Sequence, residues 1–255
     1  MRYYVFESGS KGNCTLICSK GKYLVVDNGL SKRKFKAYLA NVNVSFEDIR
    51  AVLLTHSHTD HIAGVSIFDE YAVYSSKETY PVDDQHVLVP YSIYYINDFK
   101  VTVIPTSHDA KGSIGFIIED DEEKLVYITD TGYVYEKVLD YIKDADYYIF
   151  ESNHDVRMQL LTGRPQYLID RIMGDHGHLS NEDASLYLSE IISSRTKEIV
   201  LAHLSLEANT PELALKAFYK IMAKRGVNVE NINVRTASQN EMLSGGDVLK
   251  ELCHD

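Results

Sequence analysis

Four potential metal ligands lie within six residues of one another, directly after an apolar segment that reads as a buried strand. The segment is 51–54, and the ligands are His56, His58, Asp60 and His61. Alternate side chains of an extended segment point the same way, so His56 and His58 can face one metal ion. Asp60 and His61 take adjacent positions as the chain turns into a helix, and can face a second. Accidental histidines in a surface loop fit poorly after so apolar a strand, so we predict a metal site.

Three further donors each follow a predicted strand. His108 comes after 100–105, Asp130 ends the strand that begins at Leu125, and His203 ends 198–202. Strands that deliver a donor at their carboxyl ends can gather distant residues into one site. A single histidine after a strand is more often structural, so the interpretation of these three depends on the first motif.

The other predicted secondary-structure elements are mostly strands in the first part of the chain and helices alternating with strands in the later part. Further strands are predicted over 3–6, 14–18, 23–26, 146–150 and 232–235, and the region 80–96 mixes short strand-like pieces. Helices are predicted over 31–39 with Ser31 as cap, from His61 through 65–71, over 133–142, from the Ser180 cap to Ile192, and from Thr210-Pro211 to near Gly226. This order suits two packed sheets with helices outside, and residues 1–255 contain no repeat or flexible linker, which favours one domain.

Composition narrows the class of protein. The chain has 255 residues, 45% of them hydrophobic, and a net charge of −11. No segment is long enough to span a bilayer and the start does not resemble a signal peptide, so we expect a cytoplasmic protein without a membrane partner. Cys14, Cys18 and Cys253 are expected to be free thiols, the first two buried. The acidic balance argues against broad electrostatic binding of nucleic acid, although bound metal ions reverse the sign locally.

The order of these motifs resembles the metallo-β-lactamase fold superfamily over nearly the whole chain. The matching features are Asp27 after a strand, the run His56-x-His58-x-Asp60-His61, and then His108, Asp130 and His203. In that superfamily each half of the chain forms a β-sheet flanked by helices. The resemblance therefore implies an α/β (α+β) fold, a four-layer αββα sandwich with the metals at one edge.

The resemblance also implies two divalent metal ions, zinc or manganese, with iron open as well. The ligands of the first ion would be His56, His58 and His108. Those of the second would be Asp60, His61 and His203, with Asp130 bridging the two. Asp27 would orient the first motif from behind.

An aspartate at position 130 bears on the reaction. Lactamases of the superfamily commonly have cysteine there, whereas its phosphodiesterases and nucleases have aspartate. Two divalent cations, Asp60, Asp130 and a bridging hydroxide leave the site formally positive, which favours an anionic substrate such as a phosphodiester.

Glu151 and His178 resemble the acid pair of the branch that processes transfer-RNA 3′ ends. There the histidine contacts the scissile phosphate and protonates the leaving oxygen, and the glutamate orients it. The alternative is that Glu151 caps a helix and His178 is a polar residue at a helix start. The sequence assigns no role to His154 or His176, and we expect His86 and His254 at the surface.

Several short motifs are similar to the bacterial YycJ/WalJ branch, for which 5′–3′ DNA exonuclease activity is proposed. They include the loop 8–13, the segment 177–181 and the segment 203–205. The loop 8–13 would lie at the mouth of the site and meet phosphate oxygens, or is a plain tight turn. Only 72 residues lie between Asp130 and His203. That leaves no room for the inserted domain of the β-CASP ribonucleases, and no long basic arm like that of RNase Z is present.

We therefore predict a dinuclear metal-dependent hydrolase in which a bridging hydroxide attacks a phosphodiester, with catalytic residues Asp60, Glu151 and His178. The substrate would be DNA or a small nucleotide, and the net charge of −11 favours a short one. Two alternatives stay open. One is an ester, thioester or lactone hydrolase of the glyoxalase II or lactonase type, and the other is a regulatory protein that senses a nucleotide without turnover. The oligomeric state is not indicated.

Overall fold

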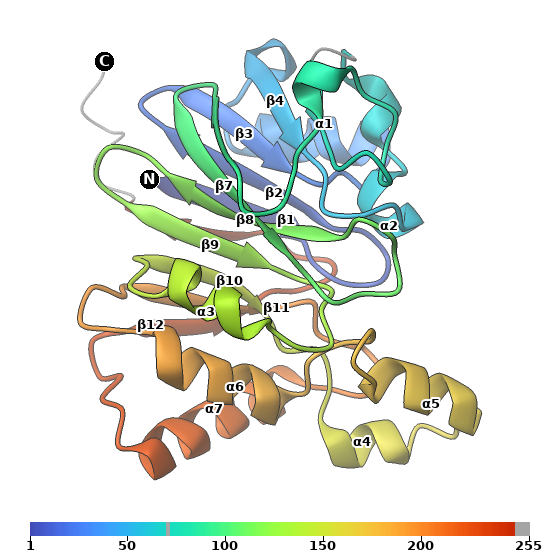
Figure 1. Ribbon diagram of the computed structural model, residues 1–255, viewed down its shortest axis with the longest axis vertical. Helices are drawn as coiled ribbons and strands as arrows, with labels where there is room; N and C mark the ends of the chain where they lie inside the picture. Colours follow the sequence, from blue (N-terminus) through green and yellow to red (C-terminus); the bar gives the residue numbers. More distant parts are fainter. Residues whose placement is uncertain (70–71, 248–255) are drawn as a thin grey trace.

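Two β-sheets pack face to face, with helices on both outer faces (Figure 1). The computed structural model describes residues 1–69 and 72–247. The predicted αββα sandwich is confirmed. That residues 1–255 form one domain stays a prediction. In the described ranges, none of the helices combines the length and the apolar character that a membrane span requires.

The first sheet contains six strands in the order β13-β1-β2-β3-β4-β5. Their bounds are β1 Arg2–Glu7, β2 Cys14–Ser19, β3 Lys22–Val26, β4 Ile49–Leu53, β5 Val73–Tyr74 and β13 Leu243–Gly246. The pairs β3–β4 and β4–β5 are parallel, and the others are antiparallel.

The second sheet contains seven strands in the order β12-β11-β10-β9-β8-β7-β6. Their bounds are β6 Ile93–Ile96, β7 Phe99–Pro105, β8 Ile114–Glu119, β9 Lys124–Ile128, β10 Tyr147–Glu151, β11 Glu198–Ala202 and β12 Asn233–Thr236. Pairing is antiparallel from β6 to β9 and parallel from β9 to β12. Strands β7, β9, β10 and β11 therefore all point the same way, and their carboxyl ends meet at one edge.

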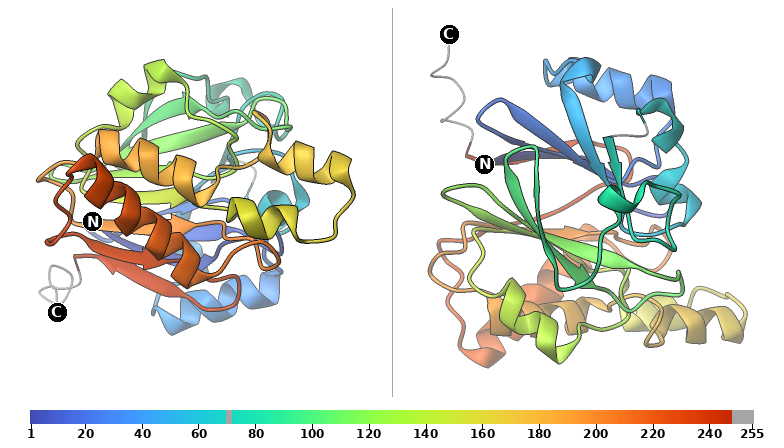
Figure 2. Two further views of the ribbon diagram at one scale, coloured as in Figure 1. Left: turned by 90° about the horizontal axis from the view of Figure 1, so that it is seen from below. Right: turned by 45° about the horizontal axis from the view of Figure 1, so that its top comes forward.

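Strand alternation divides the apolar side chains among three layers. In β1, Tyr3 and Val5 enter the core between the sheets, whereas Tyr4 and Phe6 pack in the layer beneath the first helix. Both faces of β1 are covered, so its residues 3–6 are aromatic or aliphatic on both sides. Figure 2 shows α6 and α7 side by side on the outer face of the second sheet, where a third apolar cluster lies.

The helices are α1 Lys32–Asn41, α2 Thr59–Ile62, α3 Glu136–Ile142, α4 Val156–Leu160, α5 Gln166–Met173, α6 Asn181–Ile191 and α7 Pro211–Arg225. Short 3₁₀ turns are η1 Phe46–Asp48, η2 Val65–Ile67 and η4 Asp84–His86. The predicted caps are confirmed, because the Ser31 and Ser180 side chains accept from Lys34 N and Asp183 N. Helix α7 begins with Pro211 and ends at the left-handed Gly226, as predicted.

Some sequence predictions were wrong. No helix continues from His61 through 65–71 in its described part, since α2 ends at Ile62. The helix ends there because Gly64 N donates to Asn28 O at 2.8 Å and not to a helix carbonyl. Only glycine fits at this position, since a Cβ would lie 2.0 Å from the Leu30 carbonyl oxygen. Helix α3 begins at Glu136 and not at Tyr133. Helices α4 and α5 and the last strand β13 were not predicted.

His86 is buried, which contradicts the surface position expected for it. The turn η4 folds its ring against Tyr74, with the ring centroids 4.5 Å apart. Cys14 and Cys18 are free and buried, as predicted. Cys253 and His254 lie outside the described residues.

We predict that Gly29→Ala destabilises the protein, because an added Cβ would lie 1.7 Å from the Asp60 carbonyl oxygen. Asn13 N also donates to that oxygen at 2.8 Å, and Gly29 N donates to Asn13 O at 2.9 Å, so three segments would have to move together. Urea unfolding should show a loss of about 1–3 kcal/mol. The control is Gly21→Asn, where nothing lies within 4 Å and asparagine tolerates the left-handed backbone. An unchanged Gly29→Ala midpoint would contradict this account.

Candidate metal centre

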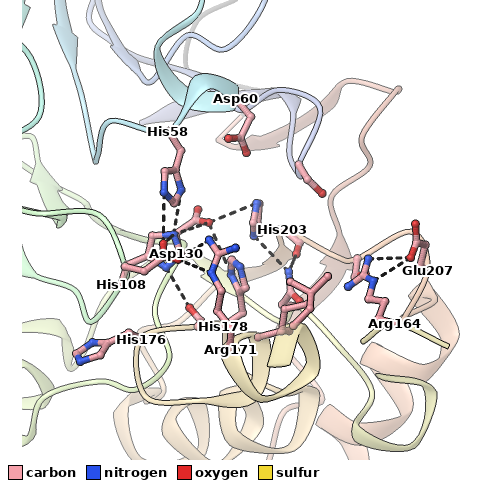
Figure 3. A pocket seen from close by; sticks show the side chains of 17 residues that line it. His58, Asp60, His108, Asp130, Arg164, Arg171, His176, His178, His203 and Glu207 are labelled. Atoms are coloured by element: carbon pink, nitrogen blue, oxygen red, sulfur yellow. Dashed lines mark hydrogen bonds and ion pairs between the residues drawn. The ribbon is translucent and has the colours of Figure 1, made fainter. Parts of the chain in front are cut away.

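The donors predicted from sequence converge into groups of neighbouring side chains. Figure 3 shows five of them around one cavity: His58, Asp60, His108, Asp130 and His203. Among the described residues, donor atoms form groups within 4.8 Å of one another. Two of the groups are the predicted ligand sets, His56 with His58 and His108, and Asp60 with His61 and His203. Asp130 joins the site from the end of β9, since it groups with both His61 and His203. The donors come from both sheets, so the site exists only where the sheets meet.

Four buried imidazoles are held through their Nδ1 atoms. The acceptors are Thr55 Oγ1 for His56 at 3.0 Å, Asp27 Oδ2 for His61 at 2.7 Å, Gly177 O for His108 at 3.1 Å and Glu151 Oε1 for His203 at 3.0 Å. Because each acceptor draws the proton to Nδ1, the lone pair of the neutral ring lies on Nε2. All four Nε2 atoms are thereby presented for coordination.

Orphaned polar atoms show that the site fits a cation. His56 Nε2, His203 Nε2 and Asp130 Oδ2 are buried and have no hydrogen-bond partner. Asp130 Oδ2 does lie 3.2 Å from His61 Nε2, an ion-pair contact. Buried acceptors without partners are costly. Nitrogen and carboxylate oxygen donors are also the chemistry that zinc and manganese accept.

Charge in this cluster is finely balanced. Burial lowers the pKa of His56 well below its ordinary value and also lowers that of His108, so both rings are neutral. Burial would raise the pKa of Asp130, but His203 and His61 outweigh it and hold the pKa well below the ordinary value. Burial would lower the pKa of His203, but Asp130 and Glu151 outweigh it and raise that pKa to about 9. Without a cation, His203 therefore carries a proton at neutral pH.

Glu151 links this cluster to His178. Its Oε1 accepts from His178 Nδ1 at 2.8 Å and from His203 Nδ1 at 3.0 Å. Its Oε2 accepts from Thr131 N at 2.8 Å and Leu179 N at 3.3 Å. Burial raises its pKa, but His178 outweighs this and the pKa falls to about 2. Glu151 is the last residue of β10 and Ser180 caps α6, so Glu151 does not cap that helix.

Asp27 supports the first motif from behind. Fully buried, it accepts from Thr55 N at 2.8 Å, from Thr55 Oγ1 at 2.7 Å and from His61 Nδ1. Asp27, Asp130 and His203 all have a left-handed φ of +57°. Such conformations persist in non-glycine residues only where the surroundings over-determine them.

Sequence analysis missed several residues of the site. Asn13 Nδ2 lies 2.9 Å from His61 Nε2 and 3.2 Å from Asp60 Oδ2, although only its loop was singled out. Asp109 Oδ1 lies 3.3 Å from His58 Nε2, and its only signal in the sequence is its position beside His108. Arg164 and Arg171 line the cavity, and they were missed because no element was predicted for the segment that contains α4 and α5.

The two histidines left without a role differ in position. His176 lines the cavity, with its Nδ1 3.1 Å from Ser107 Oγ. His154 is buried, its backbone bridges to Ser180, and burial lowers its pKa to about 4. His154 therefore joins the end of β10 to the start of α6.

The donors open onto a cavity of about 470 Å³. His58, Asp60, Asp130, His178 and His203 contribute to its wall, as does Ser10 of the first loop. This volume lies within the range of small-molecule binding sites.

Comparison with known proteins agrees with this geometry. A family model described as a β-lactamase superfamily domain matches residues 23–204. The exodeoxyribonuclease YycJ of Bacillus anthracis is 34% identical over 242 residues, which cover 90% of this chain and 92% of that protein. The exodeoxyribonuclease WalJ of Streptococcus pneumoniae is 35% identical over 243 residues, covering 89% and 90%.

A solved structure shares the fold. The metallo-β-lactamase fold protein YhfI of Bacillus subtilis superposes with a TM-score of 0.68 at 19% identity, covering 96% of this chain and 99% of that one. The fold and the site define a metal-dependent hydrolase. The chain belongs to the β-lactamase superfamily and, within it, to the family of YycJ and WalJ.

We predict that binding of a divalent cation expels the proton of His203. Since its pKa is raised to about 9, the folded protein without metal is protonated there below that pH. Affinity for the cation should therefore rise by at least about tenfold per pH unit between pH 7 and 9. His61 adds to this rise, because Asp27 and Asp130 outweigh burial and hold its pKa well above the ordinary value, so its proton must leave as well. Titration calorimetry in buffers of different ionisation enthalpy measures the released proton. A pH-independent affinity with no proton release would contradict the assignment.

Proposed function

We propose that the chain is a dinuclear phosphodiesterase that degrades DNA as an exodeoxyribonuclease. The observation that carries the proposal is the carboxylate of Asp130 among four imidazoles whose Nε2 atoms converge, with the Glu151–His178 pair beside it. The names of the YycJ and WalJ relatives support DNA as the substrate. A DNA substrate in bacterial relatives also favours the cytoplasm as the compartment.

The proposed ligand sets follow the two groups of donors. His56, His58 and His108 would hold one cation, and Asp60, His61 and His203 the other, with Asp130 between them. Zinc or manganese fits these donors. When bound, such cations supply Lewis-acid stabilisation of the charge on the phosphate and activate water for attack.

His178 would protonate the leaving oxygen. Its Nδ1 proton is held by Glu151 Oε1 at 2.8 Å, so Nε2 is the free atom, and the ring lines the cavity. The ionised Glu151 holds the His178 ring through Nδ1 and so orients it. As the bond from phosphorus to the leaving oxygen breaks, Nε2 gives its proton to that oxygen and the imidazole becomes neutral.

We predict that His178→Ala impairs DNA cleavage far more than hydrolysis of bis(p-nitrophenyl) phosphate. A sugar alkoxide needs a proton to depart, whereas p-nitrophenolate does not, so kcat on DNA should fall by about 10²–10⁴-fold and the loss on the small diester should be minor. The control is His176→Ala, which removes a histidine of the same cavity that bonds Ser107 instead. Equal losses on both substrates would exclude a proton-donor role. No cleavage by the metal-loaded protein, with His58→Ala behaving identically, would contradict the proposed function itself.

We predict that Asp27→Asn weakens metal binding by about 10–100-fold. An amide nitrogen placed at Oδ2 cannot accept from His61 Nδ1 and Thr55 Oγ1, so the His61 ring loses its orientation. Competition with a chromogenic chelator measures the affinity. The control is Asp120→Asn, at the distant β8–β9 turn, and the two variants should differ in metal affinity.

A further inference from the structure

The segment that contains α4 and α5 presents cations to the cavity. Arg164, Leu168, Arg171 and Ile172 line it, and within the described residues Arg164 and Arg171 are its only lysine or arginine side chains. Arg171 points toward the cluster of His58, His108 and His178, whereas Arg164 lies farther out (Figure 3). A chain with a net charge of −11 thus presents two guanidinium groups where a phosphodiester would enter.

Both guanidinium groups are fixed in the same way. Arg171 holds Asp109 through Nε at 2.6 Å and through Nη2. Arg164 holds Glu207 through Nε at 3.0 Å and Nη2 at 2.8 Å. In each case Nη1 has no partner among the described residues. A fork held along one edge can still donate to a phosphate from the other, so an incoming phosphate need not break either pair.

Tyr167 lies on the same helix as Arg171 and is 74% exposed. It precedes Arg171 by one helical turn in α5, a spacing that makes the two side chains neighbours on the helix surface. Leu168, Arg171 and Ile172 of the same helix line the cavity, so Tyr167 is adjacent to the face of α5 that meets it. An exposed aromatic ring beside arginines is the arrangement that single-stranded nucleic acids use for stacking.

We propose that Arg164, Tyr167 and Arg171 bind a single-stranded DNA end next to the scissile phosphate. The two Nη1 groups contact backbone phosphates, and the Tyr167 ring stacks on an unpaired base. Stacking requires a face that base pairing and neighbouring bases leave open, which selects a single-stranded end over intact duplex. This inference rests on the proposed DNA-degrading function and assigns the substrate form and its positioning residues.

Tyr167→Ala tests the stacking contact. It should lower kcat/KM for a 5′-labelled oligothymidylate by about tenfold, mainly through KM, and lower that for bis(p-nitrophenyl) phosphate much less. Tyr167→Phe should restore the wild-type value because it keeps the ring. The matched control is Tyr95→Ala, which removes a tyrosine of similar exposure, 80%, from the edge strand β6.

An abasic scan locates the stacked base. In the wild type, one abasic position in the oligothymidylate should reproduce the loss caused by Tyr167→Ala. At that position the variant should lose nothing more, because the ring and the base are partners in one contact.

Salt dependence tests the arginines. Binding of a phosphorothioate oligothymidylate, which resists cleavage, is followed by fluorescence anisotropy over a range of salt concentrations. Arg164→Gln and Arg171→Gln should each reduce the slope of log affinity against log salt by about 0.7. The control is Arg225→Gln, which breaks an exposed pair with Glu190 on the outer helices and should leave the slope unchanged.

The outcomes separate this inference from the proposed function. If the protein cuts DNA but Tyr167→Ala behaves like Tyr95→Ala, the inference is overturned and the function stands. If the protein does not cut DNA but binds it through Tyr167 and the arginines, the function fails and the binding surface stands. If it neither cuts nor binds the oligonucleotide, both are wrong.

Discussion

A buried carboxylate at the junction of the two sheets governs this structure. Asp130 is almost fully buried, and its oxygens lie 3.2 Å from His61 Nε2 and 3.5 Å from His203 Nε2. A buried charge is tolerated only where compensating charge surrounds it. The imidazoles that compensate it come from both sheets, and their outer nitrogens are fixed by Asp27 and Glu151. The packing of the two sheets therefore also sets the charge balance around Asp130 and the position of the potential metal ligands.

Glu151 connects the proposed metal ligands to the proposed proton donor. One carboxylate oxygen holds both His203 and His178, so a residue of the metal cluster and the proposed proton donor share a single anion. A change at Glu151 would disturb both functions together. Variants at His178 separate metal binding from proton transfer better, because His178 lines the cavity and is not one of the proposed metal ligands.

The α4–α5 segment adds what the metal centre lacks. Under the proposed function the donors alone would act on any small phosphodiester, whereas the proposed contacts of Arg164, Arg171 and Tyr167 would select a DNA strand. Both arginines are held by carboxylates, so their guanidinium groups are oriented before substrate arrives, which reduces the entropy lost on binding. An acidic protein can in this way bind a polyanion through a small preorganised surface.

The parts of the site that could be predicted depend on interactions between residues close in sequence, whereas the other parts depend on contacts between distant segments. The run from His56 to His61, the donors after β7, β9 and β11, and the caps of α1, α6 and α7 could be predicted because they are local: strand alternation and capping act over a few residues. The resemblance to a known family then implied which donors would bind each of the two metal ions. The buried position of His86, the early end of α2 and the contacts of Asn13 and Asp109 could not be predicted, because each depends on a segment distant in sequence.

The sequence by itself thus determined which side chains could bind metal and at which strand ends they stand. Only the tertiary structure decided which nitrogen of each imidazole is free, since that depends on acceptors such as Gly177 O and Asp27, 69 and 34 residues away from His108 and His61. It also decided that Arg171 of the unpredicted helix α5 and Arg164 just before that helix line the cavity. The physical reason is that donor type is a property of one residue, whereas tautomer, charge and access are properties of its neighbours in space.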